Sequence, residues 1–109
     1  ARDWARLGGF LAEDGVWNGE RLLPEGFVKM MQTSNGLPGG YSQMQTWLEP
    51  DYGLPSDSFW LEGHDGQFVA VIPSAQLVVV RMGLTPAWAD YRPQILVKRI
   101  IDVIRPPSN

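Results

Sequence analysis

The stretch Ser58 to Gly83, SFWLEGHDGQFVAVIPSAQLVVVRMG, decides the fold of this chain. Two β-rich runs, 68–72 and 77–80, follow a polar knot at 63–67 (GHDGQ) and are joined by a natural turn at 73–75. We expect three short strands in antiparallel succession. Because both runs carry apolar residues on both faces, the sheet must be covered on both sides, and helices should pack on it.

Helical patterns stand at both ends of the chain. Trp4, Leu7 and Leu11 recur at helical spacing and predict a helix over 2–13. A second helix should begin at Pro93, with one apolar stripe: Leu96, Val97, Ile100, Ile101 and Ile104. The sequence therefore predicts a single α+β domain over 1–109, in which N-terminal and C-terminal helices cover an antiparallel sheet of three to five strands.

Shorter elements are expected between the first helix and the sheet. Asn18-Gly19 is a strong hairpin signal, because both central positions of such a turn need positive φ. Pro24-Glu25 should open a short helix that ends near Gln32, since proline and an acidic residue suit a first turn. Alternation of apolar and polar residues over 43–48 predicts a further strand.

The segment 84–92 has an aromatic pair, Trp88 and Tyr91, and no clear periodicity. It is interpreted as a loop whose aromatic side chains pack against the domain. The alternative is that they line a cleft.

Composition excludes several classes of function. A net charge of −3 without any basic run argues against a nucleic-acid partner. The apolar runs are far shorter than the ~20 residues that span a bilayer, so no membrane association is expected. The chain has no cysteine, which removes thiolate chemistry and leaves the redox compartment open. It begins at Ala1 directly in a helical pattern, and we expect the natural polypeptide to begin further upstream.

The only histidine, His64, lies in the knot beside Asp65. One histidine without cysteine or a second histidine does not make a zinc site, and no metal or other cofactor is expected. Adjacent residues on an extended chain point to opposite faces, so Asp65 should be poorly placed to orient the imidazole. The alternative is that the knot is only a turn that needs small residues and a polar cap.

None of the six serines carries the sequence signature of an activated nucleophile. No serine is followed three residues later by lysine, and no G-x-S-x-G elbow occurs. The serines are Ser34, Ser42, Ser56, Ser58, Ser74 and Ser108. The sequence therefore predicts no catalytic residue in this chain.

Four segments carry a resemblance to a known family. They are ARDWARLG at 1–8, DGVWNGERLLPEGF at 14–27, FWLEGHDGQFVAVIPS at 59–74 and LVVVRMG at 77–83. The chain resembles the C-terminal part of serine hydrolases of the penicillin-recognising class, close to class C β-lactamases, esterases and 6-aminohexanoate-dimer hydrolases. The resemblance covers nearly the whole chain.

Enzymes of this class carry Ser-x-x-Lys, then Tyr-x-Asn or Tyr-x-Ser, then Lys-Thr-Gly or His-x-Gly on a strand that lines the site. The resemblance implies that His64-Asp65-Gly66 stands in the third position, and that the backbone N–H of Gln67 contributes to an oxyanion hole. A neutral imidazole lacks the permanent charge of lysine, which favours amide or ester hydrolysis over recognition of a β-lactam carboxylate.

Three hypotheses follow from these observations. The first is a C-terminal portion of a serine hydrolase, inert alone, whose nucleophile and base would lie before Ala1. The second is a free-standing binding or structural module that self-associates through an exposed sheet edge or apolar patch. The third is a complementing half that regains activity when an upstream polypeptide is added.

Overall fold

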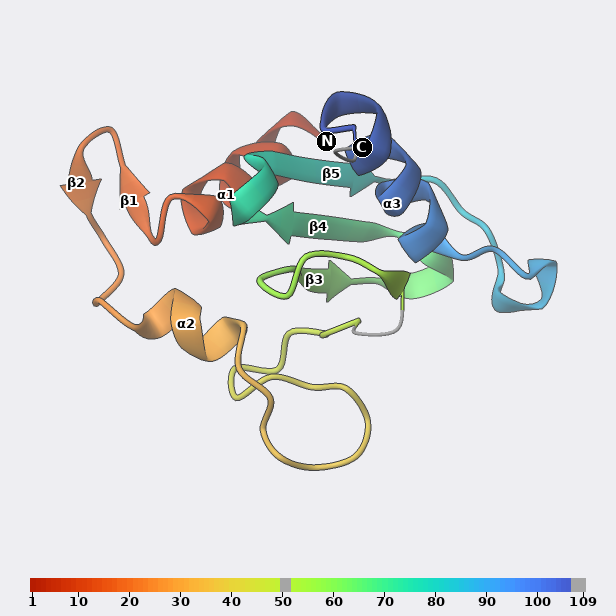
Figure 1. Ribbon diagram of the computed structural model, residues 1–109, viewed down its shortest axis with the longest axis horizontal. Helices are drawn as coiled ribbons and strands as arrows, with labels where there is room; N and C mark the ends of the chain where they lie inside the picture. Colours follow the sequence, from red (N-terminus) through yellow and green to blue (C-terminus); the bar gives the residue numbers. More distant parts are fainter. Residues whose placement is uncertain (50–51, 107–109) are drawn as a thin grey trace.

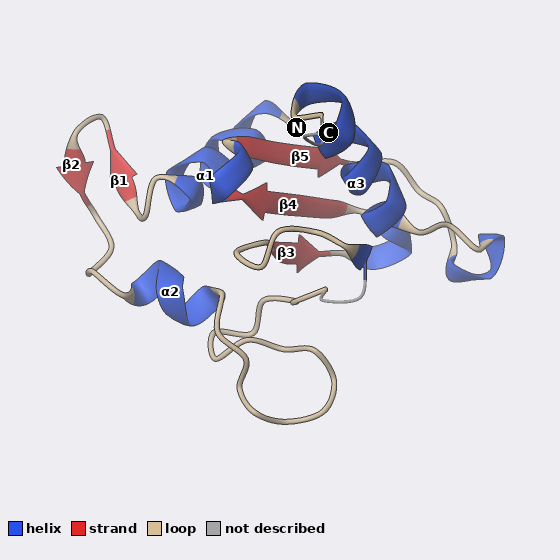
Figure 2. Cartoon of the chain, in the orientation of Figure 1, coloured by secondary structure: helices blue, strands red, loops and turns tan. Residues whose placement is uncertain are grey.

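The computed structural model of the chain describes residues 1–49 and 52–106. Figure 1 shows the elements coloured along the sequence, and Figure 2 shows the same view by secondary structure. The helices are α1 (Arg2–Ala12), α2 (Phe27–Met31) and α3 (Pro93–Ile104). The strands are β1 (Val16–Trp17), β2 (Glu20–Arg21), β3 (Phe59–Glu62), β4 (Phe68–Ile72) and β5 (Leu77–Arg81).

The main sheet has the strand order β3-β4-β5, and both strand pairs are antiparallel. This confirms the α+β class and the three strands in antiparallel succession. A 3-10 turn, Pro73–Ala75, joins β4 to β5, and Gln76 follows it at φ 50°. Val71 pairs with Phe59 on one side and with Val78 on the other, so β4 is the central strand.

The sheet separates two apolar cores. One core holds Leu11, Val28, Met31, Phe59, Val69 and Val71. The other holds Trp60, Phe68, Ala70, Ile72, Ala75, Val97 and Ile101. Alternate residues of β4 enter opposite cores, as a strand requires. Helix α1 therefore covers one face and α3 the other, as the pattern of the sequence predicted (Figure 1).

Helix α1 lies very close to the sheet because of Gly8, which is buried. A Cβ atom at Gly8 would lie 2.5 Å from Cγ1 of Val78 and 3.2 Å from Cγ1 of Val69. No side chain fits in that space without movement of the strands. The next residue, Gly9, has nothing within 4 Å of the corresponding position.

The hairpin after α1 is as predicted. Val16 pairs with Arg21 and Trp17 with Glu20, and the two turn residues, Asn18 and Gly19, have φ of 50° and 79°. The side chain of Arg21 closes the base of the hairpin by donating to Oδ2 of Asp14 at 3.0 Å.

Two expectations for the segment between the hairpin and the sheet were wrong: the residue at which one helix begins and the presence of one strand. Helix α2 begins at Phe27, because Gly26 has φ 88° and cannot continue a helix from Pro24. Residues 43–48 do not form the expected strand. Gln45 has φ 63°, which turns the chain, and of these residues only Trp47 makes isolated bridges, one with Tyr41 and one with Trp60 of β3.

The turn that replaces the expected strand has a buried polar core. Thr46 Oγ1 donates to the carbonyl oxygen of Met31 at 2.5 Å and lies 2.7 Å from the hydroxyl of Ser42. Ser42 Oγ also accepts from the backbone N–H groups of Met44 and Thr46. These bonds satisfy the hydroxyl groups inside the fold. The local bonds of Ser42 and the bond of Thr46 to the distant Met31 together outweigh the alternating pattern of the sequence.

The expectation that Trp88 packs against the domain was wrong, because its side chain is 86% exposed. Tyr91 does have a partner, since the guanidinium of Arg81 lies 4.6 Å above the centre of its ring. In α3, only Val97 and Ile101 of the expected stripe are buried. The described part of the chain has no helix long and apolar enough to cross a membrane.

Candidate functional site

The knot at 63–67 connects β3 to β4 (Figure 1). Residues His64–Gly66 form a 3-10 turn, so they lie between the strands and not on one. Within this turn Asp65 has φ 54° and ψ 46°. That left-handed conformation brings Oδ2 of Asp65 to 3.1 Å from Nε2 of His64. The expectation of an extended chain at this point was therefore wrong, and the two side chains lie close together.

Arg81, at the end of β5, holds the knot in place. It donates to the carbonyl oxygens of Gly66 at 3.1 Å and Gly83 at 3.0 Å, and it also bonds the hydroxyl of Thr85. Thr85 N–H donates to the carbonyl oxygen of Asp65 at 2.8 Å. Gly66 has φ 79°, and a Cβ atom there would lie 3.1 Å from the Arg81 side chain. The knot is thus a braced turn rather than a free loop.

Gln67 closes the turn. Its backbone N–H donates to the carbonyl oxygen of His64 at 3.4 Å, and its side-chain Nε2 donates to the same oxygen at 3.1 Å. Its own carbonyl oxygen accepts from the N–H of Gly63 at 2.8 Å. The backbone bond to His64 is long for an N–H···O bond, so the N–H of Gln67 is only weakly hydrogen-bonded.

A cavity of about 330 Å³ opens beside the knot. Its apolar lining consists of Trp4, Leu61, Phe68, Val69 and Met82, and its polar lining of Glu62, Gly63 and Gln67. The cavity thus combines an apolar wall with a few polar groups of the knot, which is the usual composition of a small-molecule site. The imidazole of His64 stands outside it, with 86% of the side chain exposed.

Glu62 lies at the boundary of two cavities. It also lines a second cavity of about 560 Å³ with Asn35, Tyr41, Gln45 and Trp47. The rings of Tyr41 and Trp47 are 4.2 Å apart. Burial, together with a hydrogen bond to the Glu49 carboxyl and repulsion from it, raises the pKa of Glu62 to about 7.

The raised pKa predicts how stability depends on pH. Because folded Glu62 holds its proton more strongly than the unfolded chain does, stability should fall as pH rises from 4.5 to about 7. Glu62→Gln should remove this decline and stabilise the protein above pH 7 by about 1 kcal/mol, a value reduced for solvent screening because Glu62 is only partly buried and keeps much of its surface exposed.

Thermal unfolding of both proteins at a series of pH values measures this effect. Glu25→Gln, at an exposed position before α2, is the matched control and should keep the decline. An unchanged pH profile in Glu62→Gln would show that Glu62 ionises as it does in the unfolded chain.

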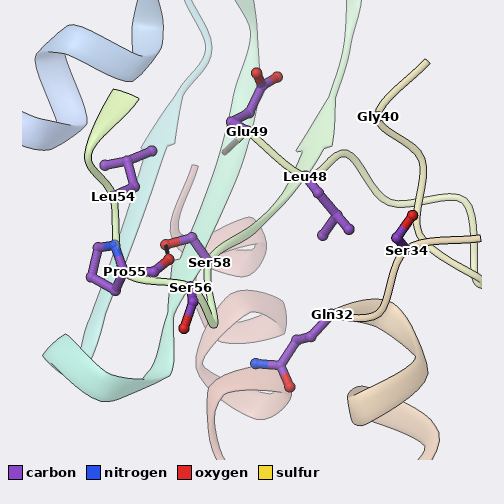
Figure 3. A pocket seen from close by; sticks show the side chains of 9 residues that line it. All are labelled: Gln32, Ser34, Gly40, Leu48, Glu49, Leu54, Pro55, Ser56 and Ser58. Carbon is purple, nitrogen blue, oxygen red and sulfur yellow. Dashed lines mark hydrogen bonds between the residues drawn. The ribbon is translucent and has the colours of Figure 1, made fainter. Parts of the chain in front are cut away.

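A third cavity, of about 360 Å³, holds three of the serines, Ser34, Ser56 and Ser58 (Figure 3). Ser58 donates its hydroxyl to the carbonyl oxygen of Pro55 at 2.6 Å. Ser34 Oγ accepts from the N–H of Gly36 at 3.0 Å. Gln32 extends from the end of α2 across the cavity and donates to the carbonyl oxygen of Asp57 at 2.9 Å (Figure 3). The contacts of Ser58 and Gln32 hold the loop before β3, and the contact of Ser34 holds the loop after α2, so both serines have structural roles.

The structure brings together all four residues that the sequence singled out as a site wall: His64, Asp65, Gly66 and Gln67. It adds three that the sequence analysis missed: Trp4, Glu62 and Arg81. Trp4 is distant from the knot in sequence, so no local pattern pointed to it. Arg81 could have been found, because it is the charged residue that ends the apolar run 77–80. Within the described ranges, no three His, Asp or Glu side chains form a group that could hold a metal ion.

Comparison of the sequence with protein-family models and with curated proteins gives no match. A function for this chain is therefore inferred from the residues of the knot and from the cavity beside it.

Proposed function

We propose that this chain forms one wall of the active site in a serine hydrolase of the penicillin-recognising class, acting on an amide or an ester. The observation that carries the proposal is the knot: a His-x-Gly turn at the end of β3, beside an apolar cavity. The resemblance in sequence supports the same position for His64-Asp65-Gly66.

In this proposal His64 lines the substrate site and Asp65 orients its ring. The distance of 3.1 Å between Nε2 of His64 and Oδ2 of Asp65 supports that role for Asp65. The N–H of Gln67 contributes to the oxyanion hole, and its present bond of 3.4 Å to His64 is weak enough to be exchanged for a substrate oxygen. One such donor is worth roughly 2.7 to 4 kcal/mol to the transition state.

The nucleophile and its base are supplied by polypeptide outside this sequence. No Ser-x-x-Lys occurs in the chain, and two serines of the cavity in Figure 3 are engaged with the backbone. The chain by itself should therefore bind no acylating reagent covalently.

Intact mass after incubation with a fluorophosphonate and with a β-lactam probe tests this. We expect no adduct on the chain alone, and one adduct on the longer polypeptide encoded with the in-frame sequence before Ala1. In that longer enzyme His64→Ala should lower kcat/KM for an ester roughly 10- to 100-fold. Glu25→Gln, on a distant exposed segment, is the control and should leave kcat/KM unchanged.

Two outcomes would contradict the proposal. Stoichiometric acylation of the chain alone would place a nucleophile within it. The absence of Ser-x-x-Lys from the in-frame sequence before Ala1 would leave the proposed enzyme without a nucleophile. Activity that returns when a separate upstream polypeptide is mixed with the chain would support both the proposal and the complementing-half hypothesis.

A second candidate role, self-association, is favoured by one specific observation: β5 is the last strand of the sheet. A negative net charge of −3 supports the exclusion of nucleic acid as the partner.

A further inference from the structure

Arg81 is joined to the cavity beside the knot by a single peptide group. Its Nη1 atom donates to the carbonyl oxygen of Gly66 at 3.1 Å and to that of Gly83 at 3.0 Å, and its Nη2 atom bonds the hydroxyl of Thr85. The next residue after Gly66 is Gln67, which lines the cavity. The peptide group between Gly66 and Gln67 therefore links the arginine to the site.

This peptide group carries both the carbonyl of Gly66 and the N–H of Gln67. In a planar trans peptide the two groups point in opposite directions and cannot turn independently. All peptide bonds that the structure describes are trans. By holding the carbonyl of Gly66, Arg81 therefore also sets the direction of the N–H of Gln67.

The charge of Arg81 also makes this N–H a stronger donor. A hydrogen bond from a guanidinium is stronger than one from a neutral group, and it polarises the peptide that accepts it. Electron density moves toward the carbonyl oxygen of Gly66, which leaves more positive charge on the N–H of Gln67. Attack of a nucleophile on an ester carbon moves the π electron pair of the C=O bond onto its oxygen. A donor polarised in advance stabilises that negative charge more strongly.

The preceding peptide group of the knot is held from the same segment of the chain. Thr85 N–H donates to the carbonyl oxygen of Asp65 at 2.8 Å, and the Thr85 hydroxyl is the group that Arg81 bonds. The guanidinium of Arg81 lies 4.6 Å from the centre of the Tyr91 ring, which holds it in place by a cation–π contact. Two successive carbonyls of the knot are thus fixed together, and this support keeps Asp65 at its left-handed φ of 54°.

The N–H of Gln67 can engage a new acceptor at little cost. It lies 3.4 Å from the carbonyl oxygen of His64, whereas the side-chain Nε2 of Gln67 donates to that same oxygen at 3.1 Å. The carbonyl of His64 therefore keeps a donor when a substrate oxygen competes for the backbone N–H.

We propose that Arg81 is a positioning residue of this site, which holds the carbonyl of Gly66 so that the N–H of Gln67 is oriented and polarised for an oxyanion. The inference rests on the proposed function, since it assigns the oxyanion to the hydrolysis of an ester or amide. Lysine does not replace arginine in this role. Its ammonium is a point charge and lacks the planar fork that reaches several acceptors while stacked on a ring.

Nuclear magnetic resonance of the isotope-labelled chain alone measures the direction of the N–H bond. Residual dipolar couplings report how each N–H vector lies relative to the sheet. In Arg81→Lys we expect the coupling of Gln67 to shift away from its value in the unchanged chain, whereas the couplings of Val69 and Val71 in β4 stay the same.

Arg21→Lys is the matched control for these measurements. The Nη1 atom of Arg21 also donates to two backbone carbonyls, those of Asp14 and Leu23, at 3.0 Å each. These carbonyls flank the hairpin and not the knot, so the coupling of Gln67 should stay unchanged in Arg21→Lys.

In the longer enzyme, the ratio of kcat/KM for an ester to that for the matching thionoester measures the oxyanion hole. A thiocarbonyl sulfur accepts hydrogen bonds poorly, so the thionoester gains little from the hole. The ratio does not depend on the folded fraction, because both substrates meet the same enzyme. Arg81→Lys should lower it about 10-fold, a part of the roughly 100- to 1000-fold that loss of a whole donor costs. Arg21→Lys should leave it unchanged.

Thr85→Val gives a second test that leaves the strands and Arg81 itself unchanged. It removes the hydroxyl that bonds Arg81 and keeps the N–H that bonds Asp65. It should lower the ratio about two- to threefold, the effect of one hydrogen bond in the support. Circular dichroism checks that each variant folds, and Thr85→Val decides the question if Arg81→Lys does not.

The outcomes separate this inference from the hydrolase proposal. If His64→Ala lowers kcat/KM but Arg81→Lys leaves the ester-to-thionoester ratio unchanged, the enzyme stands and the role of Arg81 is overturned. An unchanged coupling of Gln67 in Arg81→Lys would overturn that role in the chain alone. If the longer polypeptide hydrolyses neither ester nor amide, the proposed function fails and the catalytic role of Arg81 fails with it, whatever the couplings show.

Discussion

Replacing Trp60 with alanine should lower the free energy of unfolding by about 3 to 5 kcal/mol, which is enough to unfold a marginally stable domain of this size. Trp60 has no exposed surface, and its ring lies 5.0 Å from that of Phe68 in the core between the sheet and α3. It is the largest of the fully buried side chains, so its removal leaves the largest cavity.

Urea denaturation followed by circular dichroism measures this change. Trp88→Ala removes the same atoms from a side chain that is 86% exposed, and it should change stability by less than about 0.5 kcal/mol. Trp60→Phe should cost less than Trp60→Ala, because the indole N–H has no hydrogen-bond partner in the described structure and phenylalanine removes that buried donor. Equal effects of the two alanine variants would show that Trp60 is not in the core.

Gly8→Ala should destabilise the protein by about 1 to 3 kcal/mol, although alanine is the better helix former. The new methyl group would lie 2.5 Å from Cγ1 of Val78, so α1 must lift from the sheet or β5 must shift. Gly9→Ala makes the same chemical change one residue later, where nothing lies within 4 Å. It should stabilise the protein by about 0.5 to 1 kcal/mol through helix propensity.

The two glycine variants are compared by thermal unfolding at one pH. We expect changes in stability of opposite sign. Both variants gain helix propensity, but only the new methyl group at position 8 would meet the sheet. If Gly8→Ala is as stable as Gly9→Ala, then α1 does not lie on Val78 at the distance described.

The main sheet and its helices could be predicted from the sequence because their signals are strong and local. Residues 68–72 are apolar at every position, and a strand of that kind is stable only when both faces are covered. The hairpin at Asn18-Gly19 was equally readable, since few residue pairs other than this one adopt positive φ twice in succession without strain. In each case the residues themselves restrict the backbone.

The errors lie where contacts between distant segments decide the conformation. The alternation over 43–48 suggested a strand, yet Thr46 bonds the carbonyl oxygen of Met31 and Gln45 takes a positive φ. Trp88 looked like a core residue by type, but neighbouring segments leave it exposed. The local sequence does not show which backbone group of a distant segment lies opposite a given side chain.

The knot at 63–67 shows most clearly which features the sequence determined and which ones depended on the tertiary structure. The sequence by itself determined that a polar turn with the only histidine stands between two buried strands, because glycine, aspartate and glutamine interrupt an otherwise apolar run. Only the tertiary structure decided that Asp65 reaches His64 and that Trp4 and Glu62 line the cavity beside them. The reason is physical: Arg81 and Thr85 hold the turn from another strand and loop, and that support permits the left-handed backbone at Asp65.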